Sequence, residues 1–227
     1  MTHRVTLGIV LLMVISACGD DSSGPATTTT ATATTSITAA PTTTTAEATP
    51  GFTAGDLPTA VLMDGDPWVA PIGGVMQFPL TIDDVWPAEA FPEERPIYEA
   101  AGFLEGSFAA FIEDEALVIT AAHLFADSPG ASAAFDLIES SFQDTELVAL
   151  ITDLEPGALD SVELLDADFG DRSSAVRVSG PEFQVVGVIW VTDNLLQFVR
   201  VGMVAGDDAR EQAAFDLAAA IAARTEG

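Results

Sequence analysis

The sequence predicts an α+β domain, in which an antiparallel sheet carries helices packed on one face. Two pairs of strand-forming runs are each joined by a short polar turn, which is typical of tight β-hairpins. A helical period of apolar residues follows each pair. The hairpin runs are 103–112 with 116–125 and 183–192 with 195–205, and the helical runs begin at Ser128 and Asp208. With a further strand at 175–179, the order β-β-α-β-β-β-α favours antiparallel pairing.

The first 17 residues have the parts of a bacterial export signal. His3 and Arg4 provide a positive start, residues 5–15 are apolar, and Ser16 and Ala17 are small. The apolar run is too short to cross a bilayer, which requires about 20 residues. We therefore interpret 1–17 as a cleavable signal peptide.

The segment Ile15-Ser16-Ala17-Cys18 resembles the bacterial lipobox. This resemblance implies that the signal is cut between Ala17 and Cys18 and that Cys18 becomes the lipid-bearing first residue. A diacylglyceryl group would hold the protein on the outer side of the cell membrane, because two or more acyl chains give firm anchoring. The alternative is an ordinary secretory signal cut nearby, which leaves a free thiol.

Residues 18–55 predict a disordered linker that starts at the lipidated Cys18. The segment consists mainly of Thr, Ala, Pro, Ser and Gly and has almost no bulky apolar side chain to bury. A coil of about 36 residues has an end-to-end distance of roughly 30 to 36 Å. The same composition is found in O-glycosylated stalks, which is a second hypothesis for this segment. The remaining residues, 56–227, are expected to form a single extracytoplasmic domain.

Residues 56–101 contain many prolines and no sustained period. We expect extended chain there, with one strand around 75–78 and one short helix near 82–86. The helix that Ser128 opens has Pro129 at the favoured first position. A shorter helical stretch is expected around 146–151.

The last third of the domain has clear turn and cap signals. Asp193-Asn194 is a good two-residue hairpin turn, because both residue types tolerate a positive φ. Asp208 and Glu211 have the spacing of a capping box, which predicts a final helix from about Asp208 to Arg224.

Three features resemble a group of actinobacterial envelope lipoproteins whose α+β domain is similar to the PsbP and LpqN folds. They are Asp56-Leu57-Pro58 after the linker, Phe169-Gly170-Asp171 before a strand, and the last hairpin with its carboxy-terminal helix. The resemblance implies a binding or accessory role in the cell envelope and no enzymatic activity.

The charge argues against a nucleic-acid partner. The chain has 35 acidic residues against 7 basic ones, a formal net charge of −28. Binding to phosphates requires a basic patch, whereas the arginines here are scattered. Solubility is the simplest reading of such a charge, and a specific cationic partner is the alternative.

We assign no catalytic residue, metal ligand or cofactor from the sequence. Cys18 is the sole cysteine, and no Gly-x-Ser-x-Gly elbow or glycine-rich phosphate loop is present. His123 lies on a strand face with apolar residues and is expected to be a packed, hydrogen-bonded histidine. The segment 166–171 departs from a calcium loop, since Gly170 occupies its fifth position and Arg177 stands where a bidentate glutamate is needed.

Three aromatic residues of the amino-terminal segment are the candidate ligand-binding residues. Trp68, Trp86 and Tyr98 fall where the chain is irregular, so exposed rings there could line a groove for a lipid, glycan or peptide. Packing over the sheet is the simpler alternative.

These observations favour a lipid-anchored, non-enzymatic binding or accessory module. Its expected partners are the membrane, through the lipid, and a small apolar ligand or another envelope protein. Two alternatives stay open: a hydrolase that uses carboxylates and His123, and an acidic sensor or interaction domain with a cationic or metal-bound partner.

Overall fold

The computed structural model describes residues 51–67, 75–113, 116–144, 148, 159–204 and 208–225. The predicted signal peptide, Cys18 and most of the predicted linker lie outside the described residues, as do Trp68 and nearly all of the helix expected at 146–151. Among the described helices, none combines the length and hydropathy needed to span a membrane.

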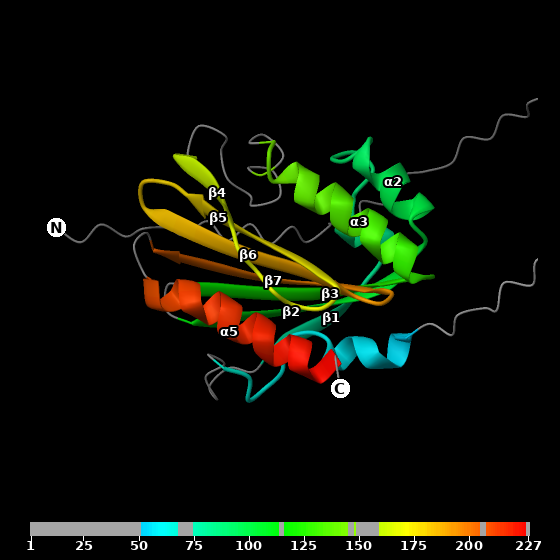
Figure 1. Cartoon of the computed structure of the whole chain (residues 1–227), viewed down its shortest axis with the longest axis horizontal. Helices are drawn as coiled ribbons and strands as arrows, with labels where there is room; N and C mark the ends of the chain where they lie inside the picture. Colours follow the sequence, from blue (N-terminus) through cyan, green and yellow to red (C-terminus); the bar gives the residue numbers. More distant parts are fainter. Residues whose placement is uncertain are drawn as a thin grey trace, which may run out of the picture. The chain divides into compact units, whose positions relative to one another are not determined.

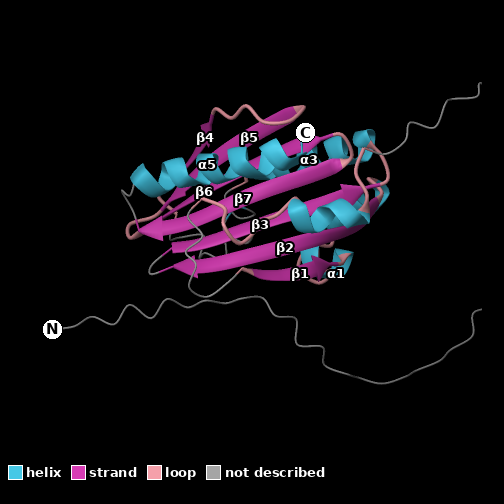
Figure 2. Ribbon diagram, turned by 90° about the horizontal axis from the view of Figure 1, so that it is seen from below, coloured by secondary structure: helices cyan, strands magenta, loops and turns pink. Residues whose placement is uncertain are grey.

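The described residues form a seven-stranded sheet in the order β1-β2-β3-β7-β6-β5-β4 (Figure 2). All neighbouring strands are antiparallel. The strands are β1 Met76–Leu80, β2 Phe103–Glu113, β3 Ala116–Phe125, β4 Ser161–Leu165, β5 Arg172–Ser179, β6 Phe183–Thr192 and β7 Leu195–Val204. The α+β class and the antiparallel pairing predicted from the hairpins are confirmed. The sequence did not predict β4, a short edge strand.

The helices begin and end where local chemistry favours it. Asp127 caps α3, because its carboxylate accepts a hydrogen bond from the amide of Gly130, and Pro129 lies in the first turn. The helices are η1 Ala54–Thr59 (a 3₁₀ helix), α1 Ile82–Val85, α2 Glu94–Ala100, α3 Ser128–Ser141 and α5 Asp208–Thr225. The helix α2 was not predicted, because Pro96 lies inside it.

Helices cover both faces of the sheet, not one face as the sequence suggested. On β7, Leu195 packs in the core cluster that includes α5, whereas Leu196 packs in the cluster that includes α3. Successive side chains on a strand point to opposite faces, so these two clusters lie on opposite sides. In Figure 1, α5 lies below the sheet while α2 and α3 lie above it.

The turn between β6 and β7 also fixes the entry of the chain into the domain. Asp193 has a φ of 53°, as expected for this hairpin. The next residue, Asn194, is 1% exposed and donates hydrogen bonds to the carbonyl oxygens of Phe52 and Phe125. Its own side-chain oxygen accepts from the amide of Phe52. These hydrogen bonds tie Phe52, near the start of the described residues, to the β6–β7 turn.

The capping box predicted from Asp208 and Glu211 stays a prediction, because the Asp208 side chain lies outside the described residues, but Glu211 has other partners. The Glu211 carboxylate binds the Arg177 guanidinium and accepts a hydrogen bond from Gln184. The hydrogen bonds from Arg177 to Glu211, and the charge of Glu211, raise the pKa of Arg177. Because Arg177 also binds Glu163 on β4, this ion-pair network ties the edge strand and α5 to β5.

We expect Gly130→Ala to destabilise the domain by about 1–3 kcal/mol, because the added methyl group would collide with the carbonyl oxygen of Ala101 at the end of α2. The control is Gly187→Ala, whose methyl group meets its nearest neighbour, a Val176 methyl carbon, at 3.5 Å. Urea denaturation of both variants measures the difference. Equal free energies of unfolding for the two variants would show that Gly130 does not lie this close to the carbonyl oxygen of Ala101.

Candidate functional site

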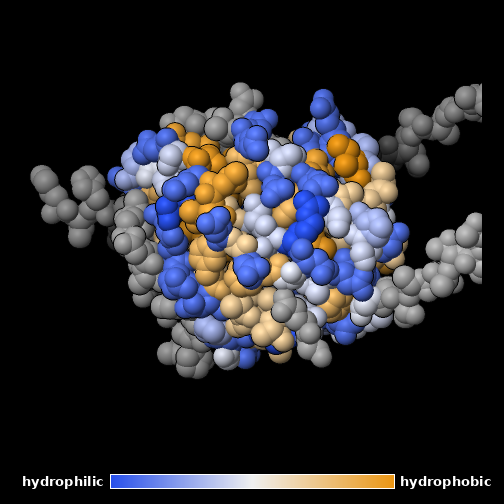
Figure 3. All heavy atoms as spheres, in the orientation of Figure 1, coloured by the Kyte–Doolittle hydropathy of each residue, from blue (hydrophilic) through white to orange (hydrophobic). Residues whose placement is uncertain are grey.

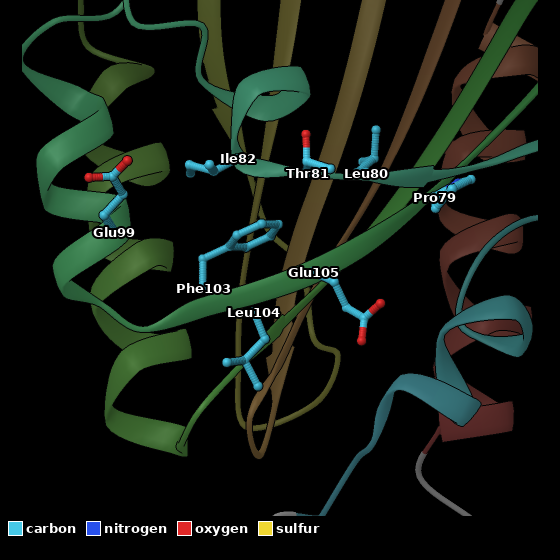
Figure 4. Close-up of a pocket in the computed structure, with 8 residues that line it drawn as sticks. All are labelled: Pro79, Leu80, Thr81, Ile82, Glu99, Phe103, Leu104 and Glu105. Atoms are coloured by element: carbon cyan, nitrogen blue, oxygen red, sulfur yellow. The ribbon is translucent and has the colours of Figure 1, made fainter.

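An open pocket of about 340 Å³ lies at one edge of the sheet, where the chain leaves β1 and where β2 begins. Its volume is at the lower end of the range for small-molecule sites. Figure 4 shows the Phe103 ring between β2 and the segment that carries Thr81 and Ile82, while Leu104 and Glu105 leave β2 on the other side. The lining residues are Pro79, Leu80, Thr81, Ile82, Glu99, Phe103, Leu104 and Glu105.

A capping box forms one wall of the pocket. The Asp84 carboxylate accepts hydrogen bonds from the amide and the hydroxyl group of Thr81, at 2.7 and 2.6 Å. This reciprocal cap starts α1 directly after β1 and turns the chain away from β2. The two segments therefore diverge, and the pocket lies between them.

A glycine and a β-bulge form the opposite wall. Gly102 has a φ of 80°, the left-handed conformation that commonly ends a helix, and it connects α2 to β2. The pairing register of β2 with β3 then shifts between Phe103 and Glu105. Such a bulge re-aims side chains, and here it leaves Leu104 58% exposed at the rim.

Behind the pocket lies a cluster of aromatic rings. The ring centroid of Phe103 is 5.6 Å from that of Tyr98 and 5.7 Å from that of His123. Tyr98 in turn packs against Trp86 and Phe125. Phe103 is thus the one member of this group that lines the pocket, and the others hold its ring in place.

His123 is buried at the centre of this cluster and is hydrogen-bonded to Tyr98. The Tyr98 hydroxyl oxygen is 2.5 Å from His123 Nδ1, and both side chains are at most 2% exposed. Burial lowers the pKa of His123 to about 3 and raises the pKa of the Tyr98 phenol. The packed, hydrogen-bonded histidine expected from the sequence is confirmed.

The charge around the pocket is mostly negative. Arg95 on α2 binds Asp83 and Glu99, and these two carboxylates raise its pKa. Glu105 has no ion-pair partner among the described residues. Asp84, the capping-box partner of Thr81 in the first turn of α1, adds a further carboxylate. This region therefore has one arginine and four acidic side chains, which gives it a negative charge.

Two of the three candidate aromatic residues, Trp86 and Tyr98, lie in the described part of the chain, and both are buried. Trp86 is 4% exposed and Tyr98 is 0% exposed, so both are core residues in this structure. Tyr98 supports the pocket through Phe103, whereas Trp68 lies outside the described residues. A role for these rings in direct ligand contact stays a prediction. The spacing of Thr81 and Asp84 is typical of a capping box. In the sequence it could have indicated the start of α1, where the pocket lies.

The acidic segment 166–171 forms a turn into β5. Gly170 has a φ of 56°, and the Asp171 carboxylate accepts a hydrogen bond from the amide of Asp193. In the part of the chain that the structure describes, no group of three or more His, Cys, Asp or Glu side chains is arranged to hold a metal ion.

A second apolar surface lies at the far edge of the sheet. Figure 3 shows hydrophobic surface over β4 and β5, where Leu164 is 54% exposed, surrounded by hydrophilic side chains. Leu164 does not line the pocket at the opposite edge of the sheet. Leu164 is therefore a natural control for Leu104, since the two leucines are similarly exposed at opposite edges.

The described residues thus form an α+β domain with a small, largely apolar pocket at one sheet edge. No family model matches the sequence, and no curated protein matches it. The fold is similar to that of the extracellular domain of PknH from Mycobacterium tuberculosis, with 13% identity and a TM-score of 0.36 over 77% of this chain and 92% of that one. It is also similar to a putative uncharacterized protein, the Rv0999 ortholog, from Mycobacterium smegmatis, with 14% identity and a TM-score of 0.38 over 69% of this chain and 91% of that one.

Proposed function

We propose that this protein is a lipid-anchored, extracytoplasmic binding module that accommodates an apolar group in the pocket between β1, α2 and β2. The pocket itself supports the ligand-binding part of this proposal. Leu80, Ile82 and Phe103 line it, and the bulge of β2 holds Leu104 at the rim, largely exposed to solvent. Covering such a side chain with a ligand is favourable, at about 25 cal/mol per Å² of apolar surface.

The anchor part of the proposal rests on the sequence before Cys18, which resembles a lipobox. The linker would then hold the domain at a distance from the membrane. The net charge of −28 supports this arrangement, because anionic headgroups repel an acidic domain at close range.

The hydrolase alternative receives less support from the geometry. A general base must lie within hydrogen-bond reach of a substrate proton, whereas His123 is 2% exposed and surrounded by aromatic rings. Its low pKa also means that it is neutral throughout the physiological range.

Binding of N-phenyl-1-naphthylamine, a neutral probe that fluoresces in apolar surroundings, tests the pocket. The mature full-length chain with Ser in place of Cys18 is used, so that no attached lipid competes. We expect saturable binding that Leu104→Gln weakens about fivefold, as roughly 1 kcal/mol of lost apolar contact would give.

The matched control is Leu164→Gln, which removes a similarly exposed leucine from the far edge of the sheet. It should leave the affinity for the probe unchanged. Equal losses in the two variants, or no saturable binding to the parent chain, would disprove ligand binding at this pocket.

A further inference from the structure

The pocket combines apolar walls with an excess of negative charge at its rim. Glu99 extends from α2 and Glu105 from β2, and both line the pocket together with Phe103 (Figure 4). Both carboxylates are exposed, and the side chain of Glu99 is 51% accessible to solvent. They are therefore accessible to a charged group of a bound molecule.

The arginine next to the pocket does not neutralise this charge. Its guanidinium is shared, since Nη1 lies 2.5 Å from an oxygen of Asp83 and Nε lies 2.8 Å from an oxygen of Glu99. It also donates to the carbonyl oxygen of Trp86. One positive charge divided between two carboxylates leaves a negative balance, to which Glu105 adds.

We propose that the ligand of this pocket is a cationic amphiphile: a small molecule with an apolar group and an ammonium or guanidinium group beside it. This inference rests on the proposed function. The apolar group packs against lining residues such as Phe103 and Ile82, and the cation is attracted by the exposed carboxylates of Glu99 and Glu105 at the rim. A carboxylate on the ligand would face repulsion from both glutamates and from the strongly acidic domain as a whole.

Three molecules of nearly the same shape separate the contribution of ligand charge to the affinity from that of the apolar ring. They are 1-naphthylmethylamine, 1-naphthylmethanol and 1-naphthoate. Calorimetric titration of the mature full-length chain, again with Ser in place of Cys18, measures each affinity at low salt. We expect the amine to bind about tenfold more tightly than the alcohol and the carboxylate to bind most weakly. At 0.5 M salt the preference for the amine should fall to about threefold or less, because exposed charges are screened.

The site of the charge effect is tested with Glu99→Gln combined with Glu105→Gln, which should weaken binding of the amine roughly tenfold and leave binding of the alcohol unchanged. Glu105→Gln alone should weaken the amine about threefold. The control is Glu182→Gln, which removes an exposed carboxylate from the turn between β5 and β6.

Each outcome is decisive. Equal binding of the amine and the alcohol, or a preference for the amine that survives in the double variant, would overturn the cationic ligand while the apolar pocket stands. An equal loss in Glu182→Gln would also overturn it, because the attraction would then belong to the whole domain. If the alcohol does not bind at all, the proposed function fails as well.

Discussion

Lowering the pH from 7 to 5 should reduce the free energy of unfolding by about 2 kcal/mol through one buried histidine. Burial holds His123 neutral down to a pKa of about 3, whereas the same residue in the unfolded chain protonates near its ordinary value of 6.5. Between these two values the unfolded chain binds the extra proton, so acidification favours unfolding. The stability gained from the neutral ring is complete above pH 6.5 and decreases as the pH falls toward 3.

Urea denaturation at pH 7 and pH 5 measures this effect. The comparison is the double variant His123→Leu with Tyr98→Phe, which removes both partners of the buried hydrogen bond and leaves no unpaired polar atom from that pair. The carboxylates titrate alike in both proteins, so the difference isolates the histidine. An equal loss of stability in the two proteins would contradict the buried, neutral state of His123.

Cys18→Ser should move the protein from the membrane fraction into the medium, or leave it unprocessed. We propose acyl chains on one sulfur as the anchor, and without them a strongly acidic protein, whose full sequence has a net charge of −28, has no affinity for an anionic surface. Fractionation of cells that express the full-length chain measures the shift, and mass spectrometry of the amino terminus identifies the modification.

Ser22→Ala is the matched control, because it changes a neighbouring residue and keeps the thiol. It should remain in the membrane fraction. If the Cys18→Ser protein stays membrane-bound with normal processing, lipidation of Cys18 is disproved. Ligand binding at the pocket would not be affected by that result.

The sequence predicted most of the sheet because hairpins are local. The runs around Glu113 and the Asp193-Asn194 turn specify both pairings within a few residues, and the structure confirms them. Pro129 marked the start of α3 for the same reason. The central strands could also have shown that both faces are covered, since Val188 to Val191 form a continuous apolar run and all four are buried.

The elements that form the pocket were harder to predict from the sequence. The helix α2 was not predicted because proline usually interrupts helices. Pro96, however, lies in the first turn, where a proline loses no helical hydrogen bond. Trp86 and Tyr98 lie in a proline-rich segment that reads as irregular, and their burial depends on β3 and α3, which come later in the chain. Leu104 reaches the pocket rim because of a bulge that depends on pairing with β3.

The position of a bound ligand on the domain tests directly whether the pocket between β1, α2 and β2 is the binding site. The mature full-length chain with Ser in place of Cys18, labelled with ¹⁵N, is titrated with 1-naphthylmethanol, and the backbone amide shifts are followed by NMR. Binding in the pocket should produce saturable changes at Leu80, Thr81, Ile82 and residues 102–105, with none in β4. Changes centred on β4 and β5, or none at saturating probe, would contradict it.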